Sequence, residues 1–116
     1  MLIGVLSDGP ELDSEVSEDF GHAPYFLMVD SETMDYTVVD NEFTEAEGAG
    51  MLVAKAIVGL GVDAVIVGGI GSHGYDILAG AGIDVSMDEE GSVESCVTDY
   101  VRRYERRKRF EAMEKD

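Results

Sequence analysis

Hydrophobic positions in the first 41 residues form three short runs, each about the length of a β-strand. Residues 1–7 (MLIGVLS) are almost continuously apolar, which is typical of a strand buried on both faces. An acidic stretch, residues 8–19, separates this run from two others at 25–30 and 36–41. Only a short polar connection lies between the last two runs, so they are predicted to pair as a hairpin.

Beyond residue 48 the apolar positions recur at the spacing of an α-helix. Glu45 and Glu47 lie near its expected start, where the helix dipole favours negative charge, and Gly61 follows its end. Lys55 is the only charged residue from 48 to 62, which predicts a heavily buried helix. The residues at helical spacing are Ala49, Leu52, Val53, Ala56, Ile57 and Leu60.

A half-repeat follows this helix. Residues 59–67 (GLGVDAVIV) and 80–88 (GAGIDVSMD) each end a helix and continue into a strand. This pattern indicates two consecutive right-handed crossovers onto parallel strands. A third helix with an apolar stripe is predicted from Val93 to Tyr104. The remaining residues, 105–116, are mostly charged, and we expect them to fray or to project.

The element order is therefore β-β-β-α-β-α-β-α, a hairpin followed by crossovers. This order is that of a ribonuclease H-like α/β domain, with three layers and a mixed five-stranded sheet. The domain is predicted to cover residues 1–104, with 105–116 as a charged C-terminal helix extension. If the first strand lies between the second and the fourth, the turn before the second and the turn after the fourth share one end of the sheet.

Composition narrows the class of protein. The 116 residues are 45% hydrophobic, which predicts one packed domain, and no run reaches the ~20 apolar residues of a membrane span. The apolar start at residues 1–6 is too short for a signal peptide, so a cytoplasmic location is expected. Cys96 is the single cysteine; it excludes an internal disulfide, and its place on an apolar stripe predicts a buried, inert thiol.

Charge is divided unevenly along the chain, whose net charge is −17. Residues 1–101 carry 21 acidic side chains and one basic one, a net charge of −20, whereas residues 102–116 carry a net charge of +3. A body this acidic repels the nucleic-acid backbone, which excludes phosphate-tracking partners. Two interpretations of the acidity remain open: a solubilising surface, or adaptation to high salt, where screening removes the self-repulsion.

Gly69, Gly71 and Gly74 follow the predicted fourth strand at the spacing G-x-G-x-x-G. This spacing resembles a dinucleotide fingerprint, which normally opens a larger doubly wound sheet. Only 42 residues remain after Gly74, and no basic group stands nearby, which argues against a nucleotide. Close packing alone, and a ligand of another kind, both remain open.

Catalytic constellations are absent from the sequence, and two histidines remain as candidate ligands. The predicted first and fourth strands hold no carboxylates for a two-metal nuclease, and there is no G-x-S-x-G elbow. His22 precedes the second strand and His73 follows the fourth, both beside glycines, so both are candidate metal ligands. If the first strand lies between those two strands, the two turns are about 10 Å apart at their bases, at one end of the sheet. Each could equally be a solvent-facing or hydrogen-bonded side chain.

Two stretches carry a family resemblance. Residues 7–30 (SDGPELDSEVSEDFGHAPYFLMVD) and 61–85 (GVDAVIVGGIGSHGYDILAGAGIDV) resemble the two signatures of the dinitrogenase iron–molybdenum cofactor biosynthesis family. The resemblance implies a ribonuclease H-like fold without enzymatic activity, and transient binding of an iron–sulfur or iron–molybdenum type cluster. The positions that match the family's motifs are Ser17, Phe20, Gly21, His22, Gly69 and Gly71. His22 stands where the family often has arginine, and a neutral imidazole can ligate iron directly.

Two functions of different class are open, one based on this resemblance and one on the split of charge between the acidic body and the basic end. The first is a non-catalytic carrier of a metallocluster or its precursor, with a cluster donor or acceptor protein as partner. The second is an interaction module that binds no cluster and docks on a partner, such as an iron–sulfur assembly ATPase, through its cleft or its basic end from Arg102 to Arg109. A solvated helix end, whose cations suit the negative pole of the helix, explains the same basic run without a partner.

Overall fold

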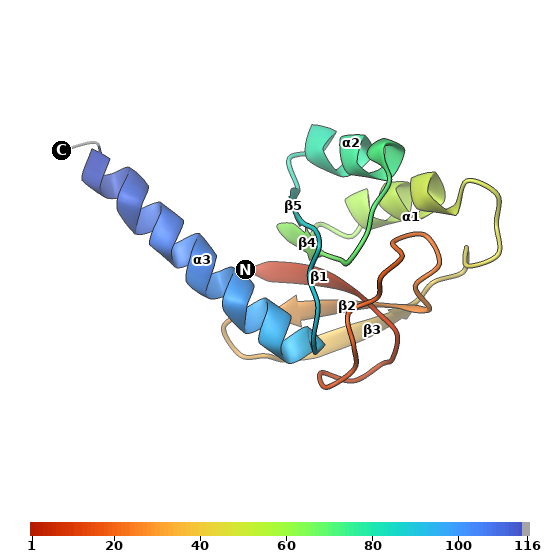
Figure 1. The fold of residues 1–116 in the computed structure, drawn as a ribbon, viewed down its shortest axis with the longest axis horizontal. Coiled ribbons are helices and arrows are strands. Elements are labelled where there is room, and N and C mark those ends of the chain that lie inside the picture. Colours follow the sequence, from red (N-terminus) through yellow and green to blue (C-terminus); the bar gives the residue numbers. More distant parts are fainter. Residues whose placement is uncertain (115–116) are drawn as a thin grey trace.

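The chain folds as a mixed α/β domain of five strands and three helices in a computed structural model that describes residues 1–114 (Figure 1). This class agrees with the sequence-based expectation. The elements in chain order are β1 (Leu2–Ser7), β2 (Tyr25–Asp30), β3 (Tyr36–Asp40), α1 (Ala49–Val58), β4 (Ala64–Ile66), α2 (Ser72–Gly80), β5 (Asp84–Ser86) and α3 (Val93–Glu114).

The sheet has the order β3-β2-β1-β4-β5, with β1 at its centre. Strand β2 runs antiparallel to β1 and β3, whereas β4 runs parallel to β1 and β5. Ile3 in β1 is paired with Val29 on one side and Ala64 on the other. The predicted hairpin of β2 and β3, and the predicted place of β1 between β2 and β4, are confirmed. The end of β4 and the start of β2 therefore lie at the same end of the sheet.

Helices cover both faces of the sheet, which explains why β1 is apolar throughout. Alternate side chains of a strand point to opposite faces. Leu6 of β1 packs in the cluster beneath α1 and α2, whereas Ile3 and Val5 pack in the cluster beneath α3. All three are fully buried, and burial of each such side chain is worth about 1.5–3 kcal/mol.

Helix α1 is amphipathic, so the prediction that it is heavily buried was wrong. Val53, Ala54 and Ile57 face the sheet and are buried. On its outer side Met51 is 41% exposed, and Leu52 is also exposed. The reason is architectural: α1 packs against the sheet and α2, and no further layer covers it (Figure 1). A lack of charge in the sequence therefore did not mean burial.

Helix α3 is continuous from Val93 to Glu114, and only its first half packs against the sheet. Its second half extends away from the domain (Figure 1). Residues 115 and 116 of the predicted extension lie outside the described residues. Cys96 lies on the buried face of this helix, as predicted, and burial, with a smaller contribution from the Glu89 charge, raises the pKa of its thiol. Within residues 1–114 no helix has the length and apolar character to cross a bilayer.

Candidate functional site

The acidic loop between β1 and β2 lies across the end of the sheet and pairs with the glycine turn that follows β4. The N–H of Phe20 donates to the carbonyl of Gly69 at 3.0 Å, and the N–H of Gly69 donates to the carbonyl of Glu18 at 2.8 Å. The N–H of Gly68 donates to the carbonyl of Ser17 at 2.9 Å. These bonds satisfy backbone groups that the short strand β4 leaves unpaired, and they fix the loop against the turn.

Gly69 and Gly71 of this turn differ in the space that a side chain would have. A Cβ on Gly69 would lie 2.8 Å from the carbonyl oxygen of Glu18, so a side chain there would push the acidic loop away. A Cβ on Gly71 would meet no heavy atom within 4 Å, and its φ of −77° is open to any residue. Packing therefore explains Gly69, whereas at Gly71 the missing side chain only leaves space open.

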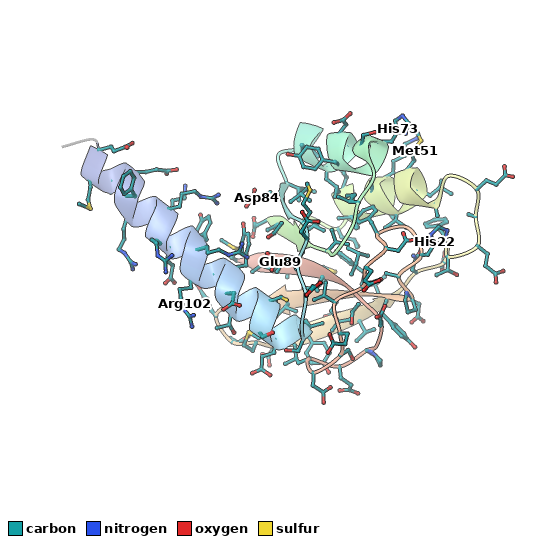
Figure 2. All side chains as sticks on the ribbon, in the orientation of Figure 1. His22, Met51, His73, Asp84, Glu89 and Arg102 are labelled. Carbon is teal, nitrogen blue, oxygen red and sulfur yellow. The ribbon has the colours of Figure 1, made fainter. Side chains whose placement is uncertain are left out.

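That space is a cavity of about 550 Å³ between the acidic loop and the N-terminal ends of α1 and α2. Figure 2 shows His22, Met51 and His73 on this side of the molecule, contributed by the loop, α1 and α2 respectively. The predicted site residues that line the cavity are Phe20, Gly21, His22, Gly69, Gly71 and His73. Both histidines thus line one cavity, at the end of the sheet where the strand order places them.

Ser17 is the predicted site residue that does not line this cavity. It is buried, and its hydroxyl is used locally: it accepts from the N–H of Asp19 and donates to the carbonyl of Asp19, both at 3.2 Å. The serine therefore shapes the turn that presents His22. Phe20 is buried as well, and its ring packs against Gly74 at the start of α2, so it forms the wall of the cavity.

Two helix N-termini end at the cavity, and neither is capped by a side chain. Gly48 precedes α1 and Gly71 precedes α2, and neither first turn contains an acidic residue. Glu45 and Glu47, expected near the start of α1, precede the helix. The first N–H groups of a helix have no partner within the helix, and the dipole there favours negative charge. This end of the cavity therefore suits an anion.

His22 is held by Asp19. Its Nδ1 lies 2.8 Å from Oδ2 of Asp19, and the N–H of Gly21 donates to Oδ1 of the same carboxylate at 3.1 Å. Partial burial alone would raise the pKa of Asp19, but the hydrogen bond and charge of His22 outweigh it and lower that pKa. A carboxylate on Nδ1 selects the tautomer whose lone pair is on Nε2, the form in which histidine binds metals.

The donor set does not resemble that of a structural metal ion. Within residues 1–114 no three His, Cys, Asp or Glu side chains come together in a way that could hold one. A structural zinc site needs four such ligands. The cavity offers instead two imidazoles, the soft thioether of Met51 and two sets of backbone N–H groups. This set suits a preformed anionic ligand with few covalent attachments.

Three residues of the site escaped the sequence analysis. Asp19 could have been found from its i, i+3 spacing to His22 within a turn. Asn41 holds the loop from the end of β3, because its side-chain N–H groups donate to the carbonyls of Gly21 at 3.0 Å and Ala23 at 2.8 Å. No local signal marks Asn41 or Met51, since both reach the site through the packing of distant elements.

Comparisons with known proteins show the family and similar structures. The family model "Dinitrogenase iron-molybdenum cofactor" matches residues 1–103. The apo form of the orange protein from Desulfovibrio gigas superposes with a TM-score of 0.82 at 34% identity, covering 87% of each chain. An NMR structure of a Thermotoga protein of the DUF35 family gives a TM-score of 0.74 at 31% identity, again over 87% of each chain. An uncharacterized protein of Methanocaldococcus jannaschii is 28% identical over 89 residues, 73% of this chain and 75% of its own.

Proposed function

We propose, from the premise that this chain belongs to the dinitrogenase iron-molybdenum cofactor family, that its cavity binds and carries an anionic metal–sulfide cluster without catalysing a reaction. The cargo would be an iron–sulfur or iron–molybdenum type cluster, or a precursor of one. The observation that carries the proposal is the convergence of two uncapped helix N-termini and the Asp19–His22 pair on one cavity.

The chemistry of such a site follows from its groups. Backbone N–H groups at the starts of α1 and α2 would donate hydrogen bonds to the sulfides or oxygens of the cargo. The Nε2 of His22 would supply one direct bond to metal, with Asp19 behind it. Glu18 and Asp19 also line the cavity, and their charge repels an anion. With one bond to metal and carboxylates nearby, the site would bind an anionic cluster weakly. Weak binding suits a carrier that must release its cargo.

One relative of known structure supports a binding function. The orange protein structure is that of its apo form, the term for a ligand-binding protein without its ligand, and that protein shares 34% identity with this chain. The proposal includes the ribonuclease H-like label for the fold. The antiparallel β1–β2–β3 unit, followed by two parallel strands, supports this label. Strands β1 and β4 hold no carboxylate of the kind that nucleases use, so the label does not bring nuclease activity with it.

Anaerobic reconstitution tests the proposal. The protein is incubated with ferrous iron and sulfide, in one arm with tetrathiomolybdate added, then desalted and assayed for metal content and visible absorption. We expect a retained chromophore, and a loss on the order of 10-fold or more in retained metal for His22→Ala. His73→Ala, measured in parallel, shows whether the second imidazole is a ligand. Glu32→Ala, in the distant β2–β3 turn, is the control. No retained metal in either arm would overturn the carrier function.

The second candidate is an interaction module associated with iron–sulfur assembly, and the projecting second half of α3 favours it. Its partner would be a cluster donor, a cluster acceptor or an assembly ATPase. Removal of residues 105–116 separates the two functions, because the family match ends at residue 103 and the cavity lies at the other helices. A carrier retains its chromophore after this truncation, whereas an interaction module loses partner capture and never had a chromophore.

A further inference from the structure

The second half of α3, residues 105–114, presents apolar and basic side chains to solvent together; we call it the projecting half. Phe110 and Met113 are 62% and 72% exposed, the highest values among the large exposed hydrophobic residues of the described chain. Three positions apart on a helix, they share one face. A run of four cations, residues 106–109, directly precedes them. Within residues 1–114, Arg106 and Arg109 form no ion pair, whereas Arg107 approaches Asp84 at 3.5 Å.

A second surface is apolar and acidic, and so is complementary to the projecting half. A groove of about 290 Å³ runs between α1 and the segment from β3 to Phe43; we call it the α1–β3 groove. Its apolar lining includes Val39, Phe43 and Leu60, and the acidic residues Asp40 and Glu42 also line it. Strand β3 is at the edge of the sheet, so nothing within the described chain continues the sheet beyond it.

The groove cannot be filled by the projecting half of its own chain. Helix α3 packs on one face of the sheet through Val93 and Val97, whereas the groove opens on the other face, where Phe26 and Ile57 belong to the opposite core cluster. The whole sheet lies between them, and α3 is one continuous helix without a hinge. A segment with apolar and basic side chains can therefore enter this groove only from another molecule.

We propose that the projecting half of α3 docks in the α1–β3 groove of a second copy of this chain. Phe110 and Met113 would cover the apolar lining, and Arg106 and Arg109 would meet Asp40 and Glu42. Charge favours a second copy as the occupant. Residues 1–101 of each copy carry a net charge of −20, so two copies repel each other unless the basic helix lies in the contact. The contact therefore joins the only basic segment to the acidic body.

The mass of the protein in solution tests this proposal. Sedimentation equilibrium of the full chain at 0.1 M salt is expected to show a dimer. Phe110→Asp is expected to give a monomer. Met87→Asp, a matched change at an exposed methionine after β5, is expected to leave the dimer intact. Circular dichroism confirms that both variants are folded.

A charge swap identifies the two surfaces. Arg106→Glu alone and Glu42→Arg alone each place like charges in every contact, so each is expected to be monomeric. Mixing the two variants restores opposite charges in both contacts, so the mixture is expected to associate. A monomeric wild type up to about 1 mM, or a dimer that survives Phe110→Asp, overturns the proposal. A mixture that stays monomeric also overturns the proposal. The projecting half would then bind an acidic partner protein and not a second copy.

Discussion

The imidazole of His22 and the carboxylate of Asp19 form a pair, with Nδ1 and Oδ2 2.8 Å apart, at the mouth of the cavity. Both side chains are largely exposed, so the pair contributes little to stability. Its consequence is chemical: the carboxylate occupies one ring nitrogen and leaves the other as an acceptor. An exposed pair with little structural value, placed at a cavity that two helix N-termini share, is where binding function is expected.

Loss of the Asp19 carboxylate is expected to weaken metal retention without changing the fold. Asp19→Asn keeps the shape but no longer selects the His22 tautomer, and loss of such a partner typically costs 10–100-fold in metal affinity. Retained iron after anaerobic desalting measures the effect. Asp35→Asn, the same change in the exposed β2–β3 turn, is the control. Equal retention by both variants would show that Asp19 does not act through His22.

Two glycine substitutions should separate binding from stability. Gly71→Ala adds a methyl group to open space at the start of α2, so we expect an unchanged melting temperature and weaker retention of the reconstituted cluster. Gly69→Ala places the methyl 2.8 Å from the Glu18 carbonyl, so we expect a loss of about 1–3 kcal/mol in the free energy of unfolding. Denaturant unfolding and metal retention are measured on both. Unfolding curves shifted equally would contradict the distinction between the two glycines.

The hydroxyl of Tyr100 donates to Oδ2 of Asp84 at 2.6 Å and ties α3 to β5. Tyr100→Phe is expected to lower the free energy of unfolding by about 1–2 kcal/mol. Burial, and then the Asp84 hydrogen bond and charge, raise the pKa of Tyr100 well above the value of about 10 that is usual for tyrosine. A raised pKa in the folded state stabilises the protein below pH 10 and loses that contribution as the pH rises further.

The pH dependence of unfolding therefore tests whether the pKa of Tyr100 is raised in the folded protein. Wild-type protein is expected to lose stability above pH 10 more steeply than Tyr100→Phe, which lacks the titrating group. Tyr104→Phe, on the ring whose centroid lies 6.3 Å from that of Tyr100, is the matched control and should follow the wild type. A wild-type curve parallel to that of Tyr100→Phe through this range would show that Tyr100 titrates alike in the folded and unfolded states.

Salt is expected to stabilise the fold. A net charge of −17 on 116 residues produces self-repulsion that a Debye length of about 3 Å at 1 M salt removes. The melting temperature should rise between dilute buffer and molar NaCl, by about 4 °C or more for each kcal/mol of repulsion removed. Sodium chloride is preferred to sulfate, which strengthens apolar burial by itself. A melting temperature independent of NaCl would favour a simple solubilising role for the acidic surface.

The sequence by itself determined the elements and their pairing. Apolar runs of strand length, a change to helical spacing at Ala49, and the half-repeat around Asp63 and Asp84 are local signals, because strand and helix periods differ. The hairpin of β2 and β3 followed from the short connection between them, whereas the place of β1 between β2 and β4 was only a condition in the sequence analysis and is given by the structure. With β1 in that place, the turns beside His22 and His73 lie at the same end of the sheet.

Only the tertiary structure decided what each side chain faces. Gly69 and Gly71 look alike in the sequence, but one touches the Glu18 carbonyl and the other borders open space. Met51 looked like a residue of a buried helix until the architecture left one side of α1 uncovered. Periodicity fixes which residues share a face of an element, whereas the neighbours of that face are set by contacts between residues far apart in the chain, which no local pattern encodes.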